Sequence, residues 1–106
     1  MATTHAAANR AYYAVFHGMR AVLALDEIDM SKHSAVIAVF RKIYLKTNIL
    51  DRRFSGLITD AFEIRNESDY DDFYIIAKTD VEQEILETKE FLEAIKAHLI
   101  NHGVMV

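Results

Sequence analysis

Apolar residues recur at intervals of three and four along most of the chain, which is the period of an amphipathic α-helix. Four segments have this pattern: roughly residues 5–25, 31–47 and 51–67, and a last one from Thr79 to near Gly103. Polar stretches separate them and the connections are short, so neighbouring helices should run in opposite directions. The pattern therefore predicts an all-α domain, built as an up-and-down antiparallel four-helix bundle.

The first segment is apolar on two sides. A helix of this kind needs neighbours on more than one side. It is either the central helix of a monomer or a helix whose second face is covered in a homodimer. Because monomers rarely leave large apolar patches exposed, we expect the homodimer. The two stripes are Tyr12, Phe16, Met19 and Leu23, and Ala8, Ala11, Val15 and Val22.

Capping signals indicate where the other helices begin and end. Ser31 is a suitable N-cap for the second helix, and Asn48 is a suitable stop. Thr79 and Glu82 have the spacing of a capping box at the start of the fourth helix. Gly103 is well placed as the C-terminal cap of that helix. We therefore expect these residues at helix ends.

The composition agrees with one helical domain covering residues 1–106. The chain has no proline and three glycines, too few for the corners of a strand-rich fold. It has no cysteine, which excludes disulfides and thiolate metal sites. A net charge of −4 argues against a general nucleic-acid coat protein, so any RNA contact must be local or assisted by a partner. Because no apolar run suits a membrane span or a secretory signal, we expect a cytoplasmic location.

Metal and cofactor motifs are scarce. No glutamate is followed three residues later by a histidine, the pair that di-iron bundles use. His98 and His102 have a spacing compatible with a metal, but exposed histidines near a helix end are the simpler interpretation. Asp60, Glu63 and Glu67 share a helix face, which could bind a cation but is more typical of a solvated surface. We therefore predict no metal, and the isolated glycines predict no phosphate loop and no cofactor.

Arg65 is the charged residue in the most unusual position. It follows Ile58 by seven residues and Ala61 by four, so it lies on or beside the buried face of the third helix. Its planar guanidinium could clamp a phosphate there. It could equally pair with Asp69 and tie the following loop to the helix. Chemistry alone favours the structural ion pair.

Two tyrosines and two histidines have similarly open roles. Tyr12 and Tyr13 are adjacent, so one should belong to the core and the other to an interface or loop contact. His17 lies on the crowded first helix, where hydrogen bonding within the bundle is more typical than catalysis. His33 follows Lys32 in the first turn of the second helix and is interpreted as a cap or packing residue.

Four short motifs resemble those of one protein family. Residues 9–17 (NRAYYAVFH) are similar to the (Ser/Asn)-Arg-Ala-Tyr-Tyr-Ala-x-Phe-His helix of small prokaryotic HEPN proteins. Residues 32–34 (KHS) precede the second helix and Phe40 follows them, in the family order. Arg65 with residues 68–70 (SDY) is similar to the family's Arg-x-x-small-Asp-Tyr element. The motifs cover almost the whole chain, and the sequence therefore resembles the HEPN domain superfamily.

The sequence departs from the HEPN pattern in two places. These proteins usually have a helix before the Arg-Ala-Tyr-Tyr helix, whereas this sequence starts almost at that motif. We therefore expect the family's usual first helix to be absent, either because the start is short or trimmed or because a dimer partner covers the exposed face. Catalytic HEPN ribonucleases have a histidine soon after the arginine, whereas this chain has Tyr70, Asp71 and Asp72. Tyrosine is a poor base at neutral pH. The arginine of the catalytic pair is thus present, and the histidine that would transfer the proton is not.

The resemblance implies a component of a two-gene toxin–antitoxin module, in which a HEPN protein pairs with a small nucleotidyltransferase. We expect a domain that dimerises, docks on that partner and holds a nucleotide or RNA near Arg65. The alternatives are a metal-independent ribonuclease that uses Arg65 with Tyr70, and a structural dimerisation module without a ligand. In related pairs the partner can modify a tyrosine near the arginine, which makes Tyr70 and Tyr74 candidate acceptors. The candidate ligand- or phosphate-binding residues are Arg10, Tyr13, Arg65, Asp69 and Tyr70.

Overall fold

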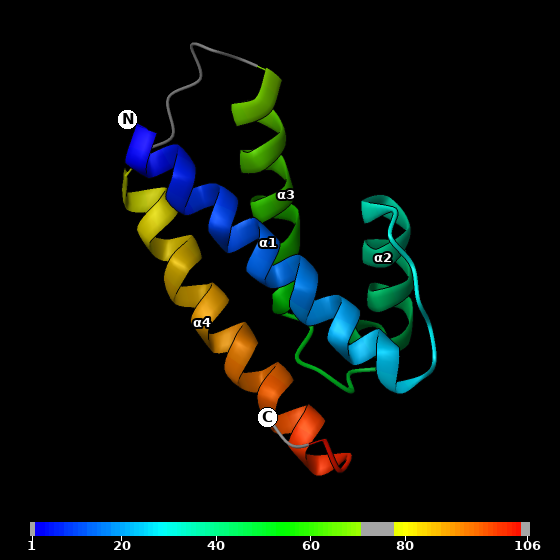
Figure 1. The fold of residues 1–106 in the computed structure, drawn as a ribbon. Coiled ribbons are helices and arrows are strands. Elements are labelled where there is room, and N and C mark those ends of the chain that lie inside the picture. Colours follow the sequence, from blue (N-terminus) through cyan, green and yellow to red (C-terminus); the bar gives the residue numbers. More distant parts are fainter. Residues whose placement is uncertain (1, 71–77, 105–106) are drawn as a thin grey trace.

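The computed structural model describes the backbone of residues 2–70 and 78–104, and the side chains of residues 6–63 and 79–104. Every regular element in this part of the chain is a helix, so the predicted all-α fold is confirmed. No helix within it is both long and apolar enough to cross a membrane. The elements are α1 (Ala2–Leu25), α2 (His33–Phe40), a short π-helix η1 (Arg41–Leu45) that continues α2, α3 (Phe54–Tyr70) and α4 (Lys78–Asn101) (Figure 1).

α1 and α2 run in the same direction, because the connection between them returns along α1 (Figure 1). Tyr12, in the first half of α1, contacts His33 at the start of α2. Val22, near the end of α1, contacts Tyr44 in η1. Residues 26–32 supply the necessary length, since an extended chain of this size can span about 23 Å. The expected antiparallel arrangement is therefore wrong for this pair of helices.

α4 also runs parallel to α1, and α3 runs opposite to both (Figure 1). Ala8 packs with Val81 at the start of the two helices. Further along, a Cβ on Gly18 would lie 3.2 Å from the Phe91 ring. Phe54, at the start of α3, packs on Phe91 in the second half of α4. The antiparallel expectation thus holds for α3 and is wrong for α1 with α2 and α4.

α1 is the central helix, and both of its apolar stripes are buried within the chain. Ala8 and Ala11 face α4, which packs along the length of α1. Tyr12 and Phe16 face α2 and α3. α4 therefore occupies the place that the homodimer hypothesis gives to a second copy. The second apolar stripe is explained within one chain and no longer indicates a missing neighbour.

The helices α1, α2, α3 and α4 pack closely around the Phe91 side chain. Its ring lies 6.0 Å from that of Phe40 and 5.1 Å from that of Phe54, between ring centres. On the third side α1 presents Gly18, and the absence of a side chain there lets the α1 backbone approach the ring. Interiors packed this tightly tolerate little change in volume.

Two predicted N-terminal caps are not at the observed helix starts. Lys32, and not Ser31, precedes the first residue of α2, and its side chain makes no capping hydrogen bond. α4 begins at Lys78, so Thr79 lies inside the first turn and the capping-box prediction is wrong. Gly103 has φ +84° just after α4, as a C-terminal cap requires. The other predicted limits lie within three residues of the observed ones.

The π-helical turn η1 fixes the second helix against the end of α1. The Tyr44 hydroxyl donates to the Val22 carbonyl at 3.2 Å and to the Asp26 carboxylate. Burial, and then the bond to Asp26, raise the pKa of Tyr44 above its ordinary value. The turn brings both Tyr44 and Leu45 into the core. It also leaves Arg41, its first residue, on the side that faces α3.

Candidate functional site

Aromatic rings surround a histidine where α1, the start of α2 and the middle of α3 meet. Tyr12, Tyr13, Phe16, His33 and Phe62 form this group, which we call the histidine–tyrosine cluster. The Tyr12 hydroxyl and His33 Nδ1 lie 2.5 Å apart in a hydrogen bond. The ring centres of Phe16 and His33 are 4.0 Å apart, and those of Tyr12 and Phe62 are 6.2 Å apart. The cluster therefore joins three helices around one imidazole.

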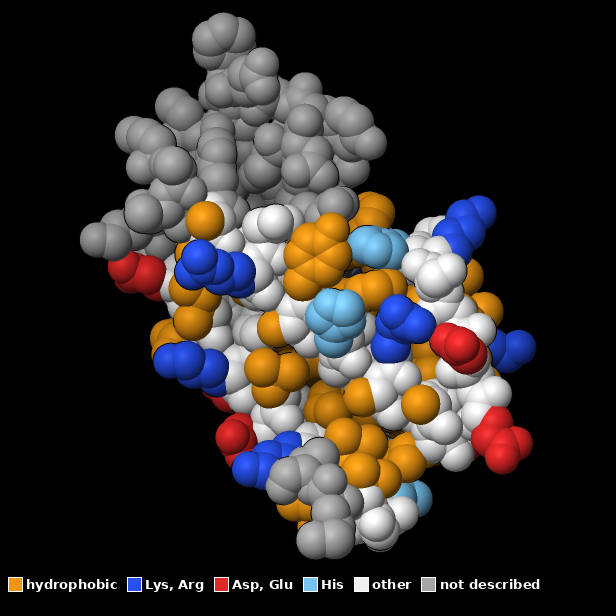
Figure 2. Space-filling view, in the orientation of Figure 1, with side chains coloured by type: hydrophobic (Ala, Val, Ile, Leu, Met, Phe, Trp, Pro, Cys, Tyr) orange, Lys and Arg blue, Asp and Glu red, His pale blue; other side chains and the backbone are white. Residues whose placement is uncertain are grey.

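The spacing of aromatic residues on α1 builds one side of this cluster. Tyr12 and Phe16 are one helical turn apart and buried. Tyr13 is half-buried at the edge, and the ring centre of the exposed His17 lies 6.1 Å from its own. Figure 2 shows histidine side chains beside hydrophobic ones on the face that carries α1. The cluster is thus part of the core on one side and open to solvent on the other.

The hydrogen bond from Tyr12 determines what the His33 ring can do. If the hydroxyl donates to Nδ1, the neutral ring carries its proton on Nε2. If Nδ1–H donates to the hydroxyl oxygen, Nε2 is the acceptor. In both tautomers the bond to Tyr12 engages Nδ1 and holds the ring in place. Imidazole suits proton transfer because it ordinarily titrates near neutral pH.

The predicted site residues on α3 lie just beyond this cluster. Phe62 belongs to the cluster, and the backbone remains helical through Arg65, Asp69 and Tyr70. Arg65 follows Phe62 by three residues, an advance of about 4.5 Å along the helix axis. The side chains of Arg65, Asp69 and Tyr70 lie outside the described residues, as does the whole of Tyr74.

The structure separates the two candidate residues on α1. Tyr13 belongs to the cluster and has its ring centre 6.2 Å from that of His33. Arg10 is exposed and faces α4, where it lines a hollow of about 320 Å³ with Ile85 and Lys89. Arg10 and Tyr13 therefore do not contribute to one small site, although they are three residues apart.

Sequence reasoning treated His33 as a packing residue and did not single out Phe62. The signal that could have found His33 is the Lys32-His33-Ser34 motif, which stands in the family order. The motif does not contain the hydrogen-bond partner of His33, because Tyr12 lies 21 positions earlier in the chain. Only the return of the connection along α1 brings the two side chains together.

Histidines and carboxylates do not form a recognisable metal centre in the part of the chain that is described. The rings of His98 and His102 lie 4.2 Å apart at the end of α4. His102 Nδ1 is hydrogen-bonded to the His98 carbonyl at 2.8 Å. Burial, and then the nearby His102, lower the pKa of His98.

Glu84 is a candidate that the sequence pattern missed. It lies on α4 with 3% of its surface exposed, and neither carboxylate oxygen has a hydrogen-bond partner among the described residues. Burial, and then the charges of Asp60 and Glu87, raise the pKa of Glu84 to about 7. A buried carboxylate without a partner is costly to ionise. Groups of this kind make stability depend on pH.

The Glu84→Gln variant is expected to be more stable than the wild type above pH 7, by up to about 3 kcal/mol. The folded pKa of about 7 exceeds the ordinary 4.5, so folding favours the protonated carboxyl. Wild-type stability should therefore fall as the pH rises between these values, and glutamine cannot ionise. Urea unfolding from about pH 5 to pH 8 measures the difference, which should grow with pH. Glu82→Gln, exposed on the same helix, is the control, and a difference that is constant with pH would contradict the assignment.

Several known proteins are similar in sequence to this chain. The model of the HEPN domain family matches residues 1–99. Two proteins of Methanocaldococcus jannaschii, each named "Putative toxin", are 34% identical over 99 residues (93% of this chain, 67% of the relative) and 29% identical over 90 residues (85% and 66%). A UPF0332 protein of Thermotoga maritima is 33% identical over 92 residues (87% and 70%). No solved structure matches the chain.

Proposed function

The chain belongs to the HEPN domain family, and from this premise we propose that it is the HEPN component of a toxin–antitoxin module that binds RNA or a nucleotide beside Arg65. The toxin designation of two relatives supports this role. The observation that carries the proposal is the position of the histidine–tyrosine cluster, which adjoins α3 one turn before Arg65. An arginine that binds phosphate beside aromatic rings that stack on bases is a common way to hold single-stranded RNA.

Replacing Arg65 by alanine is expected to weaken the binding of a short single-stranded RNA by about tenfold or more, because one charge-assisted hydrogen bond contributes about 1.5–3 kcal/mol. Fluorescence anisotropy with labelled RNA measures the affinity at several salt concentrations. The matched control is Arg20→Ala, which removes a partly exposed arginine of α1 that pairs with Asp29. Equal affinity of the Arg65 variant and the wild type would refute the site.

A second candidate function is metal-independent RNA cleavage, and a specific observation favours it. Tyr70 was the sequence-based candidate for the proton-moving group, but tyrosine is a poor base at neutral pH. The structure supplies a histidine from another helix, because His33 is held by Tyr12 beside the same part of α3. In this proposal His33 takes the 2′-hydroxyl proton, and Arg65 stabilises the charge that develops on the phosphate.

The partner proteins remain proposals that rest on the family. A nucleotidyltransferase would assist RNA binding by a chain whose own net charge is −4. Its modification of Tyr70 or Tyr74 is tested by mass spectrometry of the peptide that contains both tyrosines, after reaction with the partner and ATP. An unmodified peptide would refute this modification.

A homodimer is tested by light scattering of the purified chain. A dimer that binds no RNA would favour the structural module without a ligand.

A further inference from the structure

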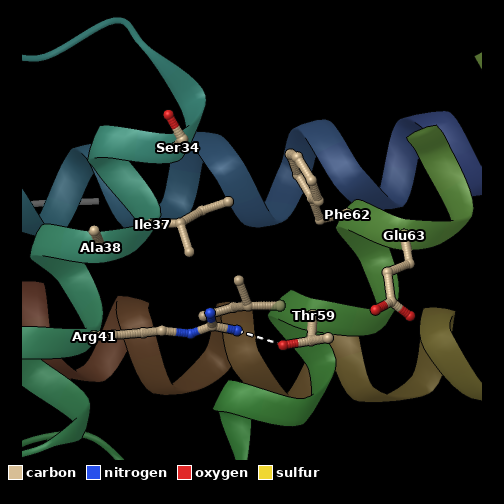
Figure 3. A pocket seen from close by; sticks show the side chains of 8 residues that line it. Ser34, Ile37, Ala38, Arg41, Thr59, Phe62 and Glu63 are labelled. Atoms are coloured by element: carbon tan, nitrogen blue, oxygen red, sulfur yellow. Dashed lines mark hydrogen bonds between the residues drawn. The ribbon is translucent and has the colours of Figure 1, made fainter.

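A cavity lies between α2 and α3 and has a volume of about 290 Å³. Its walls are apolar, and Figure 3 shows Ile37 on α2 and Phe62 on α3 on either side of it. Polar side chains stand at its edges. The lining residues are Ser34, Ile37, Ala38, Arg41, Ile58, Thr59, Phe62 and Glu63.

Arg41 is only partly bonded to the protein around this cavity. Its Nη2 donates to the Ser55 carbonyl at 3.0 Å and to Thr59 Oγ1 at 2.5 Å (Figure 3). Its Nε is buried and has no hydrogen-bond partner among the described residues. Leaving a buried, charged donor unsatisfied is costly. Arg41 is also the first residue of the π-helical turn η1, and such turns are frequent at functional sites.

The charges around the cavity are of both signs. Arg41 supplies a guanidinium from the α2 side, and Glu63 supplies an exposed carboxylate from α3. The described lining contains no other charged residue. Apolar side chains line the cavity between the two charges. The cavity therefore presents a cation at one end, an apolar slot in the middle and an anion at the other end. This arrangement complements a small molecule that has an anionic end, an apolar body and a hydrogen-bond donor.

We propose that this cavity binds a small organic anion that also has an amino group. The anionic group bonds to Arg41, the apolar body lies between Ile37 and Phe62, and the amino group faces Glu63. The volume is at the lower end of the range for ligand pockets, which restricts the ligand to a small molecule. The cavity shares Phe62 with the histidine–tyrosine cluster, but its cation is Arg41 and not Arg65, so the two proposals are tested by different variants.

NMR titration of the wild-type chain tests the cavity with two probes, 4-aminobenzoate and 4-aminophenyl phosphate. These probes distinguish a carboxylate from a phosphate as the anionic group. At least one should shift the backbone amide signals of Ile37 and Thr59 with a dissociation constant on the order of 1 mM or tighter. Arg41→Gln should weaken the same binding at least tenfold. Arg52→Gln is the matched control, because Arg52 also donates to one carbonyl, that of Lys46, but lies outside the cavity.

A second variant keeps the test decisive if the loss of Arg41 disturbs the fold. Ala38→Trp fills the cavity from an exposed position and leaves Arg41 in place. It should abolish the shifts at Thr59. The proposal is overturned if neither probe shifts these signals at about ten times the expected dissociation constant, or if the folded Arg41 or Ala38 variant binds as well as the wild type. Arg65→Ala should leave the titration unchanged, so failure of the RNA site and failure of this cavity are distinguishable.

Discussion

Replacing Phe91 by alanine is expected to lower the free energy of unfolding by about 3–5 kcal/mol. The Phe91 ring is completely buried and contacts Phe40 on α2 and Phe54 on α3. It also packs against the α1 backbone at Gly18. The substitution removes apolar contacts with all the other helices and leaves a cavity that they cannot easily fill. Since domains of this size are stable by about 5–15 kcal/mol in total, the loss would be a large fraction.

Urea unfolding, followed by the helical circular dichroism signal, measures this effect. The midpoint should fall while the slope of the transition stays unchanged, because the surface exposed on unfolding is nearly the same. Leu86→Ala is the matched control, since Leu86 lies on the same helix with 56% of its surface exposed. We expect the control to change stability by less than about 1 kcal/mol. Equal losses in the two variants would show that Phe91 is not the centre of the core.

The helices were predictable because their apolar residues repeat with the helical period, but their directions were not. The antiparallel prediction assumed that short connections join neighbouring helices. Residues 26–32 are long enough to return along α1, and their path depends on contacts such as that between Arg20 and Asp29. Such contacts are not visible in the pattern of apolar residues. The direction of α2, and with it the position of His33, therefore needed the structure.

The same limit applies to the two apolar stripes of α1. The stripes show that the helix needs neighbours on both sides, but they do not identify those neighbours. A second copy and α4 would satisfy them equally well. The parallel path of α4 places Val81 beside Ala8, so α4 covers this stripe within one chain. Burial was thus predictable for these residues, whereas the helix that covers them was not.

Glu84 shows how a regular pattern can hide a residue. Along α4, apolar spacing in steps of four and three proceeds from Val81 to Ile85 and then to Thr88. Val81, Glu84 and Thr88 are spaced by three and then four residues, which places them on one helix face equally well. The hydrophobic residue was the natural choice for the buried position. In the structure Glu84 is the more buried of the two.

Replacing His33 by glutamine is expected to lower the rate of RNA cleavage by about 10²- to 10⁴-fold, the usual contribution of a general acid or base. In the proposed reaction, His33 Nδ1–H donates to the Tyr12 oxygen, so Nε2 carries the lone pair that takes the proton of the 2′-hydroxyl, and the 2′-oxygen attacks the adjacent phosphorus. The bond from phosphorus to the 5′-oxygen breaks, and water protonates the departing oxygen. Glutamine keeps a polar side chain of similar reach but cannot exchange this proton. RNA affinity should therefore change little.

Cleavage of a labelled RNA in the presence of EDTA measures the rate and excludes a metal contribution. His17→Gln is the matched control, because the His17 ring also lies beside Tyr13, 6.1 Å away between ring centres, but His17 is exposed on α1. Tyr12→Phe should cause a smaller loss than His33→Gln, since it removes the bond that holds the imidazole and leaves the imidazole itself. If the His33 variant cleaves RNA at the wild-type rate, His33 is not the base. If the wild type binds RNA without cleaving it, the binding function is favoured, because an arginine beside an aromatic cluster is sufficient to hold RNA without breaking it.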